Sequence, residues 1–246
     1  MRLEERLEYM AGVIALVGSG EYLDTMDAID RLLLAESGTA SPGVVCLPTA
    51  AGREGPASVE RWSQMGKAHF RRLGAEVESA LIVDRASADD PQWAALIEAA
   101  DLIYFSGGDP GYLYQTLVGT CAWDAVTSAY ARGASLAGCS AGAMILGQYL
   151  PSRPALDFKF VSAFGWIRNC LVLPHFDRLP FRSMLLPLIR RKLAGGQYAL
   201  GIDENTALVG RMGGEWQVMG AAGVSLMTRR DSKKYPAGSR LALPGA

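Results

Sequence analysis

The sequence has few of the residues that bind metal ions or form disulfides. Among its 246 residues are two histidines and four cysteines. The cysteines are widely spaced, with no C-x-x-C pair: Cys46, Cys121, Cys139 and Cys170. This spacing argues against a zinc site and against a disulfide framework. We therefore expect no bound metal, reduced and mostly buried thiols, and a cytoplasmic location. With only His69 and His175 present, few side chains can serve as a general base.

The chain also lacks a dominant charge and a long apolar run. Its formal net charge is −1, from 24 basic and 25 acidic residues. It therefore has no basic stripe for nucleic acid and no polybasic patch for a membrane surface. No apolar run approaches the roughly 18 residues that span a bilayer. Residues 1–10 are charged throughout and lack an apolar core, so they predict a charged extension rather than a secretory signal.

Short apolar strands alternate with helices over most of the chain. The expected strands are 13–17, 43–50, 80–83, 101–105, 133–137 and 170–173, and the expected helices are 25–36, 58–73, 90–100, 111–118, 121–132 and 182–193. Continuous apolar strands between helices predict an α/β fold with three layers (α/β/α) and a mostly parallel sheet. Half of the residues are hydrophobic, and no linker or repeat divides the chain. Residues 1–246 are therefore expected to form a single domain.

The pattern changes after residue 146. Residues 150–160 contain two prolines and are expected to form a surface excursion. Residues 198–209 predict a strand, a tight acidic turn and a second strand. Residues 216–220 and 223–227 are expected to form an antiparallel pair near the end of the chain.

The most specific motif is Gly138-Cys139-Ser140-Ala141-Gly142, which follows an apolar strand and precedes a helical segment. A strand, G-x-S-x-G and a helix in this order are the sequence form of a nucleophile elbow. Glycine is needed on both sides, because a Cβ there would collide with the neighbouring strand or helix. This frame selects Ser140 as nucleophile and makes Cys139 a packed neighbour. The alternative is an ordinary helix start with an N-cap serine.

Three further loops follow strand ends: Gly18-Ser19-Gly20, Thr49-Ala50-Ala51-Gly52 and Gly107-Gly108-Asp109. The carboxyl ends of parallel strands meet at one edge of a sheet, so these loops and the elbow predict a single site. The first loop also suits a nucleotide-binding protein. However, Leu23 stands where G-x-G-x-x-G requires its third glycine.

A serine nucleophile needs a base, and the base needs a group that orients it. His69 lies in a basic amphipathic helix, where a solvated or half-packed surface position is expected. His175, at the end of an apolar strand, is therefore the candidate base, and the acidic pair Asp203-Glu204 offers a carboxylate. The order serine, histidine, acid differs from that of α/β-hydrolases, which would require Asp157 to orient the histidine.

These motifs together resemble peptidase family S51, the aspartyl dipeptidase and cyanophycinase family of serine peptidases. The matching segments are Gly107-Gly108-Asp109, Gly138-Cys139-Ser140-Ala141-Gly142-Ala143, Pro174-His175-Phe176 and Gly201-Ile202-Asp203-Glu204-Asn205-Thr206-Ala207. The resemblance implies a flavodoxin-like fold of the class I glutamine amidotransferase type. It implies Ser140 as nucleophile, His175 as base and Glu204 as acid, with Asp203 as the fallback.

The resemblance further implies that Gly108 and Ala141 donate to the oxyanion, and that no metal or organic cofactor is required. It implies a small peptide substrate with an acidic residue, joined through an aspartyl or β-aspartyl bond. Such a substrate calls for a cation near the site. The candidate substrate contacts are Asp109, Arg53, Arg178 and Arg182.

The sequence departs from the family pattern at two positions. Cyanophycinases tend to have glutamine where this chain has Pro174 and Pro110. The resemblance therefore supports the type of reaction more strongly than the identity of the substrate. A catalytically silent or amidotransferase-like binding protein on the same fold is the alternative. An amidotransferase would need cysteine at the position of Ser140. The oligomeric state stays open, with a homodimer as one option.

Overall fold

The computed structural model describes residues 12–151 and 159–245. The predicted charged extension at 1–10, Asp157 and most of the predicted excursion at 150–160 lie outside the described residues. Within residues 12–151 and 159–245, no helix is both long and apolar enough to cross a membrane.

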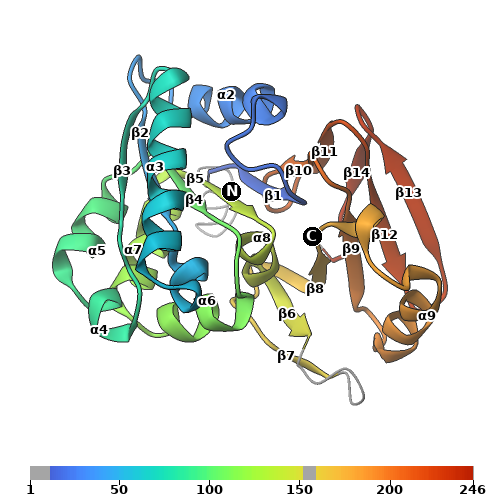
Figure 1. The fold of residues 1–246 in the computed structure, drawn as a ribbon. Coiled ribbons are helices and arrows are strands. Elements are labelled where there is room, and N and C mark those ends of the chain that lie inside the picture. The colour runs from blue at the N-terminus through green and yellow to red at the C-terminus, as the bar shows by residue number, and fades with distance from the viewer. Residues whose placement is uncertain (1–11, 152–158, 246) are drawn as a thin grey trace, which may run out of the picture.

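The described helices and strands alternate along the first half of the chain, and strands dominate the second half (Figure 1). The α-helices are α2 (Asp27–Ala35), α3 (Pro56–Arg72), α4 (Arg85–Ala88), α5 (Pro91–Glu98), α6 (Pro110–Leu117), α7 (Cys121–Arg132), α8 (Ala141–Leu146) and α9 (Arg182–Lys192). The 3₁₀ helices are η1 (Asp24–Met26), η2 (Thr49–Glu54) and η3 (Phe176–Arg178). The strands are β1 (Ile14–Val17), β2 (Gly43–Leu47), β3 (Glu76–Ser79), β4 (Leu102–Phe105), β5 (Ser135–Cys139), β6 (Gly147–Pro151), β7 (Phe160–Ser162), β8 (Ile167–Leu173), β9 (Tyr198–Ile202), β10 (Thr206–Gly210), β11 (Glu215–Gly220), β12 (Gly223–Thr228), β13 (Ser232–Pro236) and β14 (Arg240–Ala242).

The first sheet has the strand order β14-β11-β10-β1-β5-β4-β2-β3. Its strands β1, β5, β4, β2 and β3 are parallel, whereas β10, β11 and β14 extend it by antiparallel pairing. Side chains on β1 alternate between two cores. Ile14 and Leu16 pack with α5, α6 and α7, while Ala15 and Val17 pack with α2 and α3. Helices thus cover both faces, and the predicted α/β fold with a mostly parallel sheet is confirmed.

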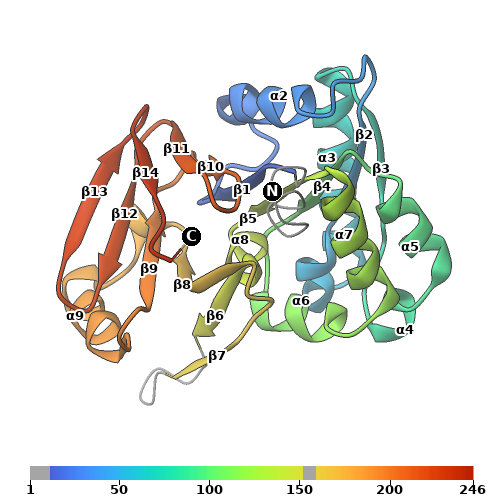
Figure 2. The same ribbon diagram turned by 180° about the vertical axis from the view of Figure 1, so that it is seen from behind.

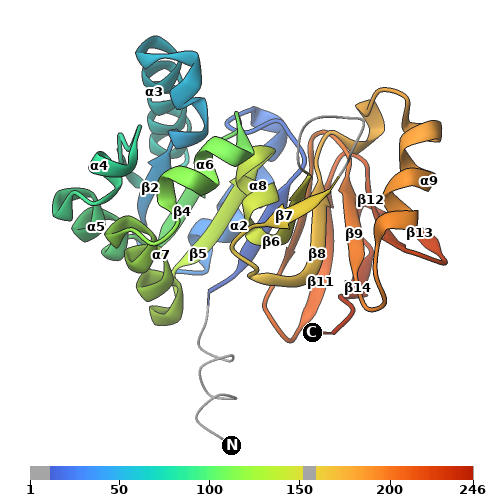
Figure 3. The ribbon, with the colours of Figure 1, turned by 90° about the horizontal axis from the view of Figure 1, so that it is seen from below.

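A second sheet, not predicted from the sequence, stands beside the first (Figures 1 and 2). Its order is β13-β12-β9-β8-β6-β7, with β6, β8 and β9 parallel. One face shares the core of the first sheet through residues such as Val172 and Leu200. The other face is covered by Ile189 of α9 and by Leu193, the residue that follows this helix. Figure 3 shows α8 between the two sheets, where it contacts β5, β6 and β8.

The expected strand at 80–83 is wrong, because the strand lies one segment earlier, at Glu76–Ser79. β3 is at the edge of the sheet and alternates exposed and buried residues. Such an edge strand does not read as a continuous apolar run. The glutamates at its exposed positions also discourage pairing with another chain.

The expected pairing of 216–220 with 223–227 is also wrong, although both segments are strands. β11 pairs with β10 and β14 in the first sheet, whereas β12 pairs with β9 and β13 in the second. The connection between β11 and β12 crosses from the first sheet to the second and bonds to the other crossing, between β9 and β10. The Ala221 N–H donates to Asn205 O at 2.8 Å, and the Ala222 N–H donates to Thr206 Oγ1 at 3.0 Å.

Candidate active site

Ser140 sits on the tight turn between β5 and α8. Its backbone has φ 50° and ψ −108°, a strained conformation for a residue with a side chain. Strain of this kind costs about 1–3 kcal/mol and is concentrated at functional sites. The Ser140 N–H donates to Val17 O at 3.0 Å, which ties the turn to β1.

The two flanking glycines permit this turn. A Cβ on Gly138 would lie 2.4 Å from the carbonyl carbon and oxygen of Gly142, in α8. A Cβ on Gly142 would lie 2.4 Å from the carbonyl oxygen of Phe105, in β4. Gly138 therefore lets β5 and α8 approach each other, and Gly142 lets α8 approach the neighbouring strand β4. Both roles agree with the motif.

His175 follows β8, in the left-handed region with φ 50° and ψ 36°. Its N–H donates to Gly18 O at 3.3 Å, so the loop after β1 fixes its backbone. Its Nε2 lies 3.0 Å from Ser140 Oγ, and its side chain is 44% exposed. The imidazole is therefore within proton-transfer distance of the serine and accessible to a ligand.

Glu204 lies in the turn between β9 and β10, where the chain crosses from the second sheet to the first. Its Oε1 lies 3.1 Å from Nδ1 of His175. The Glu204 N–H donates to Asp177 Oδ1 at 2.8 Å, and Arg178 Nε is 3.6 Å from Glu204 Oε2. This contact favours the tautomer in which the Nδ1–H donates to Glu204 and Nε2 accepts from the serine.

Asp203, the fallback acid, bonds to residues other than His175. Its side chain is only 1% exposed, and its Oδ2 is 2.7 Å from Lys234 Nζ and accepts from the Gly223 N–H at 3.2 Å. Both partners belong to the strands of the second sheet. The structure therefore brings Glu204, and not Asp203, to His175.

The loop Ser106–Gly108, which we call the oxyanion loop after the role expected of it, runs beside the elbow. The position of a Cβ on Gly107 is 3.4 Å from Ser140 Cβ, and Gly108 has φ +142° and packs against Ala50 O. Within the described residues, the N–H groups of Ser106, Gly107 and Asp109 all donate to hydrogen bonds, whereas the N–H of Gly108 donates none.

The N–H of Ala141 is the first of α8 and therefore has no partner within the helix. It also donates to no other described residue. The two amides expected to bind an oxyanion thus both lack a hydrogen-bond partner among the described residues.

A model of the peptidase family S51 matches residues 14–215. The chain belongs to peptidase family S51. Cyanophycinase of Trichormus variabilis is 26% identical over 226 residues, which cover 87% of this chain and 72% of that protein. Cyanophycinase of Synechococcus elongatus is 30% identical over 174 residues, which cover 66% of this chain and 52% of that protein.

Solved structures agree with this membership. A peptidase from an acI-B1 actinobacterium superposes with a TM-score of 0.85 at 37% identity, over 96% of this chain and 98% of the other. A putative peptidase E from Listeria monocytogenes EGD-e superposes with a TM-score of 0.63 at 21% identity, over 86% and 100% of the two chains, and shows the shared fold. The S51 chain is thus a hydrolase of the serine peptidase class.

The candidate substrate contacts of the S51 chain differ in whether their charges are already paired within the protein. Arg53 Nη1 pairs with Asp109 Oδ2 at 3.2 Å, and the other carboxylate oxygen of Asp109 accepts from the Tyr112 N–H to cap α6. Arg178 is 76% exposed beside Glu204. Arg182 begins α9, and its side chain lies outside what the structure describes.

Sequence reasoning missed Glu21, a buried carboxylate directly behind the S51 elbow. It accepts from the Gly107 N–H and from the Cys139 thiol. The sequence did contain a clue to this residue, because Glu21 directly follows the glycine-rich loop Gly18-Ser19-Gly20 at the end of β1. Cys139 itself is fully buried, as expected. Burial and then the charge of Glu21 raise the pKa of its thiol, which disfavours the thiolate form that a nucleophile needs.

His69 is not at the surface as expected, because it is buried between α2 and α3 of the S51 chain. Its Nε2 lies 2.8 Å from Asp30 Oδ2, and Arg72 Nη2 is 3.2 Å from its Nδ1. The basic residues of α3 indicated an exposed face, but an acid on α2 covers this histidine. It lies outside the candidate site.

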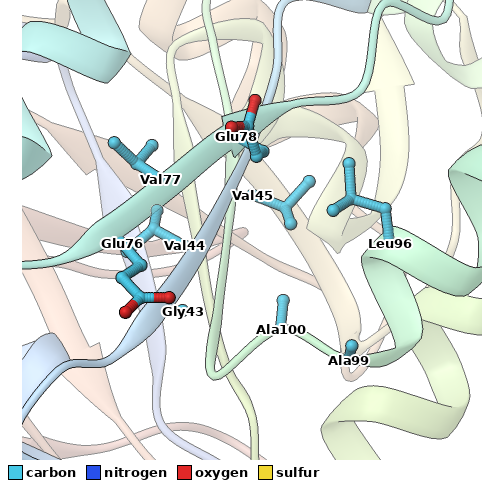
Figure 4. A pocket seen from close by; sticks show the side chains of 9 residues that line it. All are labelled: Gly43, Val44, Val45, Glu76, Val77, Glu78, Leu96, Ala99 and Ala100. Carbon is cyan, nitrogen blue, oxygen red and sulfur yellow. The ribbon is translucent and has the colours of Figure 1, made fainter.

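A surface pocket of about 230 Å³ lies against β2, β3 and α5, away from the S51 site (Figure 4). Its charged lining residues are Glu76 and Glu78, and none of Ser140, His175 and Glu204 lines it. In the part of the chain that the structure describes, no group of three or more His, Cys, Asp or Glu side chains is arranged to hold a metal ion.

Proposed function

We propose that this chain hydrolyses aspartyl or β-aspartyl bonds in short peptides, with Ser140 as nucleophile, His175 as general base and Glu204 as the acid that orients it. One observation carries the proposal: His175 lies between the other two side chains, at 3.0 Å from Ser140 Oγ and 3.1 Å from Glu204 Oε1. A nucleophile, a base and an orienting carboxylate in hydrogen-bond contact form the arrangement of serine hydrolases.

The reaction then proceeds through an acyl-enzyme. Ser140 Oγ attacks the carbonyl carbon of the scissile amide as His175 Nε2 takes the hydroxyl proton. The carbonyl electron pair moves to oxygen and returns when the C–N bond breaks, and the imidazolium gives its proton to the leaving amine. Water adds to the ester in the same way, its proton passes through His175 to Ser140 Oγ, and the carboxylic acid leaves.

The chain has groups that can stabilise both charges that develop in this reaction, the positive imidazolium and the negative oxyanion. Glu204 supports the imidazolium through its contact with Nδ1. The N–H groups of Gly108 and Ala141 hold the tetrahedral oxyanion, and loss of one such donor typically lowers kcat by about 10²–10³-fold. The chemistry needs no group beyond the side chains and amides of the chain itself.

Arg178 is the arginine that best suits an acidic substrate. Its guanidinium is mostly exposed and lies beside Glu204, so it can pair with a second carboxylate at the rim of the site. Arg53, by contrast, already pairs with Asp109. The cyanophycinase relatives and the family's preference for aspartyl substrates support an acidic substrate of this kind.

The test is hydrolysis of the dipeptides Asp-Leu and β-Asp-Leu, with Ala-Leu as the neutral control. Ser140→Ala is expected to lower kcat/KM by about 10³-fold or more, because the nucleophile is lost while the backbone amides stay in place. Arg178→Ala is expected to raise KM about tenfold for the acidic substrates only. A Ser140→Ala protein with wild-type turnover would remove the mechanism.

Two further assays separate the alternatives. Ammonia release from glutamine would favour an amidotransferase-like protein, and Cys139 is unsuited to that role because it is fully buried. Failure of a fluorophosphonate probe to label Ser140 would favour a silent binding protein. The cytoplasmic location and the homodimer stay predictions.

A further inference from the structure

Glu21 is a buried carboxylate that the proposed mechanism does not use. It follows β1 and is 9% exposed. Within the described residues it forms no ion pair, although removing a carboxylate from water is costly unless its oxygens are satisfied. Its two oxygens are satisfied by donors from the two segments that flank the nucleophile.

One oxygen holds the oxyanion loop. Glu21 Oε1 accepts from the Gly107 N–H at 3.1 Å. This bond points the Gly107 amide at Glu21 and leaves the N–H of Gly108, the next along the chain, as the one that is unoccupied. A Cβ on Gly107 would lie 2.9 Å from the same oxygen, so the glycine is what allows the carboxylate to approach.

The other oxygen holds the elbow. Glu21 Oε2 accepts from the Cys139 thiol at 2.7 Å, one residue before Ser140. The raised pKa of the thiol keeps its proton in place as the donor. A single carboxylate therefore bridges β5 and the oxyanion loop, and it fixes the distance between the serine and the Gly108 amide.

A second contact supports the same loop. The next residue, Tyr22, has φ 65° and places its hydroxyl 2.8 Å from Ser106 Oγ in the core. The loop after β1 thus holds two consecutive residues of the oxyanion loop, Ser106 and Gly107. Both contacts with this loop come from buried side chains, since Glu21 is 9% and Tyr22 is 7% exposed.

We propose that Glu21 is a positioning residue that orients the oxyanion loop, so that the Gly108 amide faces the carbonyl oxygen of the substrate at Ser140. This inference rests on the proposed function. Because the oxyanion forms during the reaction, the effect of Glu21 falls on kcat and leaves KM unchanged.

The experiment compares Glu21→Gln with Glu21→Leu, using Asp-Leu hydrolysis and the rate of labelling by a fluorophosphonate. Glutamine keeps an oxygen that accepts from Gly107, but without the charge, so kcat is expected to fall about fivefold. Leucine removes the acceptor, so kcat and the labelling rate are expected to fall about 100-fold. KM is expected to stay within about twofold of wild type in both variants.

A buried carboxylate elsewhere supplies the matched control. Asp30 on α2 is 1% exposed and accepts from His69, away from the site. Asp30→Asn is expected to lower the melting temperature while kcat at a temperature well below melting stays at the wild-type value. This control separates loss of a buried carboxylate in general from loss of the one behind the elbow.

A Glu21→Gln protein with wild-type kcat and labelling rate would overturn the inference, even if the leucine variant does not fold. A change in KM in place of kcat would also overturn it. Ser140→Ala keeps the two proposals apart. If Ser140→Ala retains activity, the proposed function fails. If it is inactive while the Glu21 variants retain wild-type kcat, only the role of Glu21 fails.

Discussion

Replacing Gly142 by alanine is expected to damage both stability and catalysis, because the added methyl group has no room. Its Cβ would lie 2.4 Å from the carbonyl oxygen of Phe105, 2.7 Å from the Phe105 Cβ and 3.0 Å from the carbonyl carbon. These atoms belong to β4, which is fully buried in the centre of the first sheet. No flexible side chain can move aside, so the helix and the strand must separate.

The size of the effect follows from these contacts. Real Cβ atoms essentially never approach closer than 3.0 Å, so α8 must move by at least about 0.6 Å. Overpacking of this kind costs about 3 kcal/mol at the upper end of its usual range. For a chain of this length, that corresponds to a fall of about 6–12 °C in melting temperature. A shift of this size at the elbow is expected to lower kcat/KM by about 10–100-fold.

The assay is thermal unfolding together with hydrolysis of Asp-Leu by the folded protein. Gly195→Ala is the matched control, since Gly195 is exposed after α9, a Cβ there meets nothing within 4 Å, and its φ is not positive. That variant is expected to melt within about 2 °C of wild type. A Gly142→Ala protein with wild-type melting temperature and kcat/KM would refute the packing argument.

Two further predictions concern the acids and the thiols. Glu204→Gln is expected to lower kcat by about 10²–10⁴-fold with little change in melting temperature, because the imidazole loses its orienting charge. Asp203→Asn is expected to lower mainly stability, because it removes the buried partner of Lys234. Equal losses of kcat in both variants would contradict the assignment of the acid. Native protein near about pH 8 is expected to react with a thiol reagent only at Cys121, and at all four cysteines after unfolding. Burial raises the pKa of the Cys46 thiol to about 12, and it also raises the pKa of the Cys139 and Cys170 thiols. Rapid reaction of two or more thiols in the native protein would contradict the burial of these three cysteines.

Much of the site could be predicted from the sequence because its requirements are local. The elbow needs a strand, a helix and two glycines at fixed spacing, and all of these are adjacent along the chain. The parallel strands of the first sheet are buried on both faces, so they appear as short apolar runs. The elbow at Ser140 and the parallel strands β1, β2, β4 and β5 of the first sheet were therefore predictable. The edge strand β3 was misplaced because it is buried on only one face.

The second sheet was not predictable in the same way. Strands β9 and β10 are joined by a short turn, as are β11 and β12, yet each pair is divided between the two sheets. Local pattern identifies strands but does not specify their partners, because the partner of a strand depends on how whole elements pack. Here the amides of Ala221 and Ala222 bond to Asn205 and Thr206, so the two connections that cross between the sheets are tied to each other.

The sequence by itself determined the tight turn that carries Ser140 and the buried parallel strands β1, β2, β4 and β5 of the first sheet. Only the tertiary structure decided which carboxylate meets the histidine, and it did so by placing Glu204 at the crossing between the sheets while Lys234 and Gly223 hold Asp203. It also decided that Glu21 lies behind the elbow and that His69 is buried against Asp30. Contacts between residues that are far apart in the chain arise when whole elements pack, and no short stretch of sequence carries that information.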